Sequence, residues 1–183
     1  MSEDLLIKHC SPTLAGIKTG NLFSCTYTTI EETEKAVRKY NNLFIPRGVK
    51  IQPLKYDKGR VLIYVYRPSK LEKDLSDEFA IKLLQQQGYK TFTPESCILN
   101  LILRINSQTE FPHEIGLFLG YPPEDVHGFI LHKGNGCKLT GCWKVYGDEE
   151  EAEKLFARFR KCSDIYYSKW KEGTSISRLT VAV

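Results

Sequence analysis

One cysteine of this sequence has neighbours that could make its thiol reactive. Cys10 is followed by Ser11-Pro12, a pair that often begins a helix, and His9 and Lys18 could each supply a nearby positive charge. A helix start and a cation both stabilise a thiolate, and a thiolate is the nucleophile of cysteine enzymes. Backbone N–H groups at a helix start can also bind an anion. The alternative is that Cys10 packs in the core, where free cysteine behaves as a small hydrophobic residue.

A second segment, residues 111–116, could supply the base that such a thiol requires. In it His113 stands beside Glu114, and an imidazole oriented by a carboxylate can take the proton of a thiol. The alternative is an ordinary helix start, with Pro112 in the first turn and Glu114 favoured there by the helix dipole.

Three basic residues are candidate ligands for an anionic substrate. Lys18 follows the cysteine motif, Arg67 ends an expected strand, and Lys144 lies in the segment Gly141-Cys142-Trp143-Lys144. Their alternative role is ordinary surface charge, with the apolar part of each side chain laid over the sheet. We therefore expect a site with three catalytic and three substrate-binding residues, namely Cys10, His113 and Glu114, and Lys18, Arg67 and Lys144.

Two histidines and two cysteines at equal spacing could suggest a zinc site. The four residues are each separated by four others, and all are suitable zinc ligands: His127, His132, Cys137 and Cys142. This spacing turns successive side chains to different sides of a helix and to opposite faces of a strand. We therefore expect no metal.

Residues 114–130 have the apolar spacing and glycine turn of a helix-turn-helix motif. The second helix would begin with Pro122-Pro123, and its base-reading end would carry Glu124 and Asp125. Such an end would be repelled by phosphates. We therefore interpret the segment as two short packed helices, and we do not expect the protein to bind nucleic acid.

The hydrophobic periodicity predicts an α+β protein with a mixed or antiparallel sheet and helices packed on it. Strands are expected at residues 5–7, 22–27, 49–56, 60–67, 139–146 and 175–183. Helices are expected at residues 29–46, 69–88, 93–105 and 148–171. The length of 183 residues fits one globular domain over residues 1–183.

Composition places the chain among ordinary globular proteins. The apolar runs are too short to cross a bilayer, and the acidic start, Met1-Ser2-Glu3-Asp4, does not resemble an export signal. We expect a cytoplasmic protein that does not bind membranes and whose six cysteines are free thiols. A net charge of +4 is too small to indicate nucleic acid as a partner.

Three segments together resemble a bacterial family. They are residues 10–18 (CSPTLAGIK), 111–126 (FPHEIGLFLGYPPEDV) and 143–148 (WKVYGD). The family is domain of unknown function 3793, from anaerobic Gram-positive bacteria. The resemblance implies a small, single-domain, intracellular protein, and it implies no particular activity or cofactor. It places five of the six candidate residues, all except Arg67, within signature segments of the family.

Our leading hypothesis is a small-molecule site built from the Cys10–Lys18 turn and the His113–Glu114 segment. It would act on an anionic small molecule, with Cys10 as a nucleophilic or redox thiol. The first alternative is a non-catalytic binding or regulatory module that acts through a protein interface. The second is a helix-turn-helix regulator. The sequence leaves open whether the protein is an enzyme, which cofactor it uses and how it oligomerises.

Overall fold

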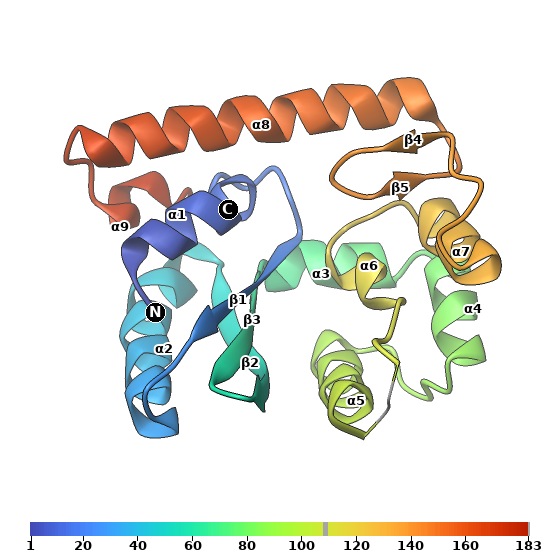
Figure 1. Ribbon diagram of the computed structural model, residues 1–183, viewed down its shortest axis with the longest axis horizontal. Helices are drawn as coiled ribbons and strands as arrows, with labels where there is room; N and C mark the ends of the chain where they lie inside the picture. Colours follow the sequence, from blue (N-terminus) through green and yellow to red (C-terminus); the bar gives the residue numbers. More distant parts are fainter. Residues whose placement is uncertain (108–109, 183) are drawn as a thin grey trace. The chain divides into compact units, whose positions relative to one another are not determined.

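The chain folds into two compact units. The computed structural model describes residues 1–107 and 110–182. Residues Met1–Ser69 and Phe159–Val183 form one unit, here called the sheet unit, and Lys70–Arg158 form the other, here called the helical unit. The long helix α8 (Glu149–Lys171) begins in the helical unit and ends in the sheet unit (Figure 1). The expected α+β class is confirmed, while one domain over residues 1–183 stays a prediction.

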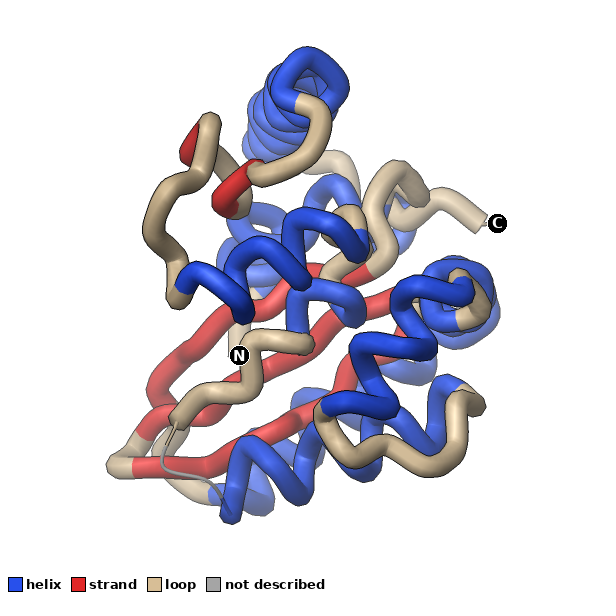
Figure 2. Tube along the Cα trace, turned by 90° about the vertical axis from the view of Figure 1, so that its right-hand side faces the viewer, coloured by secondary structure: helices blue, strands red, loops and turns tan. Residues whose placement is uncertain are grey.

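The sheet unit contains a three-stranded antiparallel sheet. Its strands are β1 (Gly20–Thr26), β2 (Lys50–Asp57) and β3 (Arg60–Tyr66), in the order β1-β3-β2, and they lie side by side in Figure 2. The strand β3 is almost wholly apolar, and this composition predicts a central strand, which is shielded from solvent. The structure places β3 between β1 and β2, as predicted. The β2–β3 turn places Lys58 and Gly59 at φ 45° and 74°, as in a type I′ hairpin.

Helices α1 (Glu3–Leu14), α2 (Ile30–Phe44) and α9 (Ile176–Leu179) complete the sheet unit, with a short 3-10 turn, η1 (Ile45–Arg47), after α2. The predicted start of α2 is confirmed, because the Thr29 hydroxyl accepts a hydrogen bond from the Glu32 N–H at 3.1 Å. Apolar side chains of α1, α2 and the strands form one buried core.

The prediction of a strand at residues 5–7 is wrong, because these residues lie within α1. A run of three apolar residues does not distinguish a strand from a buried helix segment. The longer pattern decides, since Leu6, Cys10 and Leu14 are four residues apart, share one helix face and are all fully buried.

The prediction of a strand at residues 175–183 is also wrong. Residues Ile176–Leu179 form α9, and the Ser175 hydroxyl accepts a hydrogen bond from the Arg178 N–H at the start of this helix. The cap competes locally with the apolar alternation that suggested a strand. Val183, the last residue of the expected strand, lies outside the described residues.

The helical unit consists of five helices, a small hairpin and the first part of α8 within the described residues. The helices are α3 (Pro68–Leu75), which starts at the boundary between the units, α4 (Glu78–Gln86), α5 (Pro94–Ser107), α6 (Ile115–Phe118) and α7 (Pro123–His132). The hairpin pairs β4 (Leu139–Thr140) with β5 (Lys144–Val145).

Two predicted elements of the helical unit are divided in the structure. The helix expected at 69–88 is interrupted because the Asp77 carboxylate accepts hydrogen bonds from the Phe79 and Ala80 N–H groups and begins a new helix. The strand expected at 139–146 turns back on itself at Gly141, whose N–H donates to the Trp143 carbonyl at 2.9 Å.

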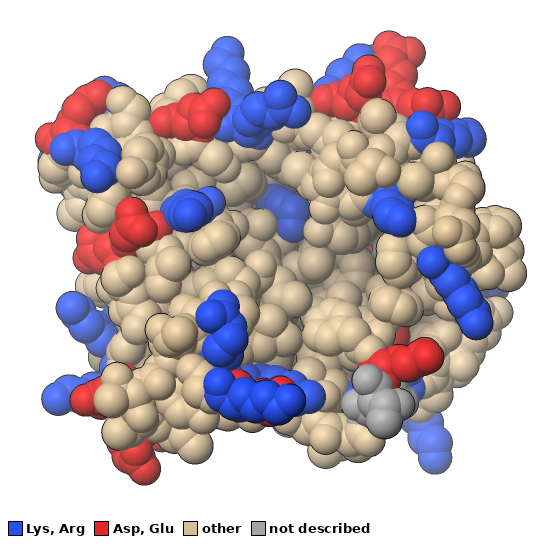
Figure 3. All heavy atoms as spheres, in the orientation of Figure 1, with Lys and Arg blue, Asp and Glu red and all other residues tan. Residues whose placement is uncertain are grey.

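Both basic and acidic side chains are present on the face drawn in Figure 3. No helix of the described residues is long and apolar enough to cross a membrane.

Candidate functional site

Cys10 lies inside α1 rather than at the end of a strand, and Ser11-Pro12 continue that helix instead of starting one. The dipole of a helix start therefore does not act on its sulfur. The side chain is fully buried in the core of the sheet unit. Burial raises the pKa of the Cys10 thiol far above its ordinary value, and the charge of Lys18 opposes this only in part. These conditions disfavour a thiolate and favour a packing role for Cys10.

A labelling experiment tests this conclusion. Under native conditions we expect iodoacetamide to modify the exposed Cys142 at least about a hundredfold faster than the buried Cys10, because the Cys10 sulfur becomes accessible only when the sheet unit opens. Peptide mass spectrometry of a time course gives both rates. Fast native labelling of Cys10 would restore the thiol hypothesis. The same reagent under denaturing, non-reducing conditions tests whether all six cysteines are reduced.

Lys18 and Arg67 both bind backbone carbonyls of the sheet unit. The Lys18 ammonium donates to the Gly20 carbonyl and the side chain is only 7% exposed. Arg67 is fully buried, and burial lowers the pKa of its guanidinium. Its N–H groups donate to four carbonyls at 2.7–3.2 Å, those of Thr13, Leu14, Arg47 and Val181. Arg67 therefore holds the end of α1, η1 and the C-terminal segment together, which is a structural role.

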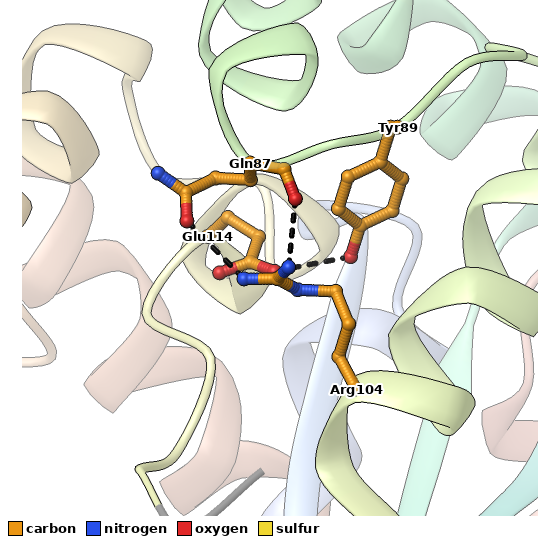
Figure 4. Close-up of polar contacts among 4 residues, drawn as sticks. All are labelled: Gln87, Tyr89, Arg104 and Glu114. Atoms are coloured by element: carbon orange, nitrogen blue, oxygen red, sulfur yellow. Dashed lines mark hydrogen bonds and ion pairs between the residues drawn. The ribbon is translucent and has the colours of Figure 1, made fainter. Parts of the chain in front are cut away.

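Glu114 lies in the helical unit, at the start of α6, and only 1% of it is exposed. Its Oε1 accepts a hydrogen bond from the Arg104 Nε at 2.5 Å and another from the Tyr89 hydroxyl at 3.2 Å. Arg104 also donates to the backbone and side-chain oxygens of Gln87 at 2.7 and 3.2 Å (Figure 4). Burial is the main cause that raises the pKa of Tyr89, followed by the charge of Glu114. This network ties α5 to the segment that carries His113.

His113 is exposed and lies on the wall of a cavity of about 280 Å³ within the helical unit. We call it the aromatic cavity, because its lining includes the rings of Phe111, Tyr121, Phe129 and Trp143 together with His113 and Lys144. The His113 ring meets the Phe129 ring edge to face, with centroids 4.9 Å apart. The structure thus places His113 and Lys144 on the same cavity.

The β4–β5 hairpin forms one wall of the aromatic cavity, and Asp125 fixes it to α7. The carboxylate of Asp125 accepts hydrogen bonds from the Trp143 indole N–H at 2.7 Å and from the backbone N–H groups of Tyr146 and Gly147 at 2.7 and 2.8 Å. The Trp143 ring stacks on Tyr121 with centroids 4.7 Å apart. The ring of Trp143 is therefore held in one orientation on both its edge and its face.

Gly141 is needed at the turn of this hairpin. A Cβ at this position would lie 2.2 Å from the Phe156 ring, which itself meets Trp143 edge to face at 4.5 Å. Any side chain would displace Phe156 and, through it, Trp143.

Lys144 supplies a positive charge to the aromatic cavity. Its ammonium donates to the Gly134 carbonyl at 2.6 Å and lies 6.0 Å from the centroid of the Phe129 ring. One hydrogen bond leaves an ammonium with further N–H groups, so Lys144 can also donate to a ligand.

A second cavity of about 530 Å³ adjoins the first within the helical unit. Phe111, His113 and Phe129 line both cavities. We call the second one the polar cavity, because its lining also includes the charged side chains of Arg104, Glu110, Glu114 and Lys133. The two cavities thus share part of their lining.

A family model described as "Protein of unknown function (DUF3793)" matches residues 6–180 of the chain. The chain belongs to this family. The resemblance noted from three sequence segments is therefore confirmed over nearly the whole chain. No curated protein and no solved structure matches the chain. The family description names no activity, so any function of DUF3793 must be argued from the site itself.

In this DUF3793 member the four residues weighed as zinc ligands have separate surroundings. The His127 ring lies against Phe79, the His132 ring stacks on Tyr146, and the Cys137 sulfur is 3.4 Å from the Thr140 hydroxyl. No three potential ligands gather anywhere in the described part of the chain.

The helix-turn-helix interpretation meets a steric difficulty in the DUF3793 fold. The helix that would read bases is α7, and its first turn is in contact with the β4–β5 hairpin through Asp125 and through the close approach of Glu124 to Gly147. A DNA groove would need that same surface.

Sequence reasoning missed the aromatic lining of the cavity. Tyr121 and Trp143 lie in two of the family segments, but Phe129 lies between those segments, and no spacing rule brings the three rings together. The signal that was present is Asp125, a carboxylate in an apolar helix. Such a group needs N–H donors when buried, and the Trp143 indole is one of them.

Proposed function

We propose that the helical unit binds a small planar molecule in the aromatic cavity. The observation that carries the proposal is the convergence of four aromatic rings with one ammonium group, that of Lys144, on a single cavity. Ligand sites are typically apolar cavities with a few polar groups that fix orientation. Aromatic walls favour flat rings through stacked and edge-to-face contacts.

The ammonium of Lys144 gives the cavity a preference for a ring that carries an acidic substituent. An acidic group, such as a carboxylate, would accept a charge-assisted hydrogen bond from Lys144. Asp125 also lines the cavity, but its carboxylate already accepts three hydrogen bonds from the protein. The proposal keeps the expected anionic small molecule, with Lys144 as its ligand and His113 beside it. Cys10 has no part in it.

A protein interface is the second candidate function, and one observation supports it. Leu99 and Leu103 lie one turn apart on α5 and are 63% and 67% exposed. Exposed apolar side chains on one helix face are a feature of interaction surfaces. Two residues make only a small patch, so the aromatic cavity is the better supported site.

Substitution of Lys144 tests the ligand preference. We expect Lys144→Met to weaken the binding of 2-naphthoate about tenfold, because it removes one hydrogen bond from a charged donor. The binding of the neutral analogue 2-naphthalenemethanol should change little. Titrations followed by ligand-observed NMR or calorimetry give both affinities.

The matched control is Lys138→Met. Lys138 precedes the same hairpin and its ammonium also donates to a glycine carbonyl, that of Gly147 at 2.8 Å, but it does not line the aromatic cavity. This variant should bind 2-naphthoate as the parent does. Absence of 2-naphthoate binding by the parent protein, or equal losses in the two variants, would contradict the proposal.

A further inference from the structure

The polar cavity is lined by charged groups of both signs, and two of these groups have no ion-pair partner among the described residues. Among the described residues, Glu110 and Lys133 form no ion pair, although both line this cavity. The other two charges, those of Arg104 and Glu114, neutralise each other at 2.5 Å. The cavity therefore has no net charge, and it does not favour a simple anion or a simple cation.

Arg104 offers hydrogen-bond donors to the same cavity in a fixed orientation. Its guanidinium has five N–H groups, and three of them donate to Glu114 and Gln87. The remaining two make no hydrogen bond within the described part of the chain. The planar group is also held over the Tyr89 ring, 5.8 Å from its centroid (Figure 4). Arg104 lines the polar cavity, and a carboxylate is a suitable acceptor for such guanidinium N–H groups.

Lys133 adds a second donor in an unusual backbone conformation. It ends α7 with φ 51°, a left-handed conformation that glycine or asparagine usually occupies. Lys133 also lines the polar cavity, and its side chain is exposed, so its ammonium is available to a ligand. The acceptor of opposite charge is Glu110, which suits an ammonium group.

We propose that the ligand of the aromatic cavity carries an α-amino acid group that occupies the polar cavity, so that the ligand class is a free aromatic amino acid. This inference rests on the proposed function, since it places the ring in the aromatic cavity. Because Phe111, His113 and Phe129 line both cavities, a ligand that reaches from one cavity to the other would contact these shared residues. In this ligand the carboxylate meets Arg104 and Lys133 in place of Lys144, and the ammonium meets Glu110.

Four indole compounds separate the parts of this ligand. Indole has only the ring, tryptamine adds the ammonium, indole-3-propionate adds the carboxylate, and L-tryptophan has both. We expect L-tryptophan to bind the intact protein at least about tenfold more tightly than indole. Tryptamine and indole-3-propionate, which each carry one charged group, should have affinities between these two. Calorimetric titration gives the four affinities.

Two substitutions then assign the charges. Glu110→Gln should lower the affinity for L-tryptophan and tryptamine and leave that for indole-3-propionate unchanged. Lys133→Asn keeps a residue that tolerates the left-handed conformation, and it should lower the affinity for L-tryptophan and indole-3-propionate but not for tryptamine. Glu95→Gln, an exposed acidic residue of α5 outside both cavities, is the control and should change none of them.

The outcomes keep this inference apart from the proposed function. If 2-naphthoate and indole bind but L-tryptophan binds no more tightly than indole, the amino acid inference is overturned and the aromatic site stands. The inference is equally overturned if Glu110→Gln and Lys133→Asn leave the affinity for L-tryptophan unchanged. If neither ring compound binds, the proposed function itself fails.

Discussion

Replacing Arg67 with methionine is expected to lower the free energy of unfolding of the sheet unit by about 3–5 kcal/mol. The guanidinium is fully buried and is the donor for four backbone carbonyls, two of them at the end of α1. Methionine fills much of the volume but donates no hydrogen bond. The carbonyls of Thr13 and Leu14 keep the N–H groups of Gly16 and Val181 as donors at 3.1 and 3.0 Å. The carbonyls of Arg47 and Val181 lose the donor that Arg67 supplies, at about 1–3 kcal/mol each, and the end of a helix loses a favourable positive charge.

The positions of the two tryptophans allow the loss of stability to be measured in the sheet unit separately from the helical unit. Trp170 packs against the core of the sheet unit, while Trp143 lies in the helical unit. Urea unfolding followed by fluorescence in a Trp143→Phe background therefore reports on the sheet unit. Arg60→Met is the matched control, since Arg60 is exposed on β3 and its guanidinium donates to the hydroxyl and carbonyl of Ser24. It should cost no more than about 1 kcal/mol. A similar small cost for Arg67→Met would show that the carbonyls of Arg47 and Val181 find other donors.

The role of Arg67 illustrates what a sequence cannot reveal. Its position at the end of an apolar strand was predicted, and this is where it lies. Its partners include the carbonyl of Val181, 114 residues away in the chain. Every residue has a backbone carbonyl, so the sequence does not indicate where several carbonyls converge in the fold. A basic residue after a strand therefore suggested a ligand for an anion, although it is a structural donor.

Sequence signals predicted the structure more reliably where a side chain forms a hydrogen bond with a backbone group a few residues away. The cap at Thr29 and the cap at Asp148, whose carboxylate accepts from the Glu151 N–H at 3.0 Å, both follow from spacing alone. The apolar strand β3 and the acidic first turn of α8 follow from composition. Cys10 had no such signal, because a small apolar-like residue gives the same pattern in a reactive turn and in a buried helix face.

The candidate site was predictable in part. The segments at 111–126 and 143–148 were singled out, and the structure brings His113 and Lys144 to one cavity. The cavity exists because the β4–β5 hairpin turns at Gly141 and is attached to α7 by Asp125. Both features depend on tertiary contacts, which the sequence pattern does not show. Glu114 was expected beside a catalytic histidine, and the structure instead gives it Arg104 and Tyr89 as partners.

The second large effect is expected at Glu114. Glu114→Ala should lower the free energy of unfolding of the helical unit by about 3–5 kcal/mol, because it leaves the guanidinium of Arg104, only 23% exposed, without its carboxylate partner. The Tyr89 hydroxyl also loses its acceptor. Urea unfolding in a Trp170→Phe background, which leaves Trp143 as the reporter, measures the loss.

An exposed ion pair of the same unit provides the comparison for Glu114. Glu150 and Lys154 of α8 lie 2.8 Å apart, but their side chains are 82% and 63% exposed, so Glu150→Ala should cost about 0.5 kcal/mol or less. Burial, and not the short distance, makes the difference, since water solvates an exposed ammonium once its partner is removed. Glu114 also fixes the segment that presents His113 and Phe111 to both cavities. Glu114→Ala should therefore weaken 2-naphthoate binding as well, even at urea concentrations where the protein remains folded. Equal stability losses for the two glutamates would show that the Arg104 guanidinium reaches water when Glu114 is absent.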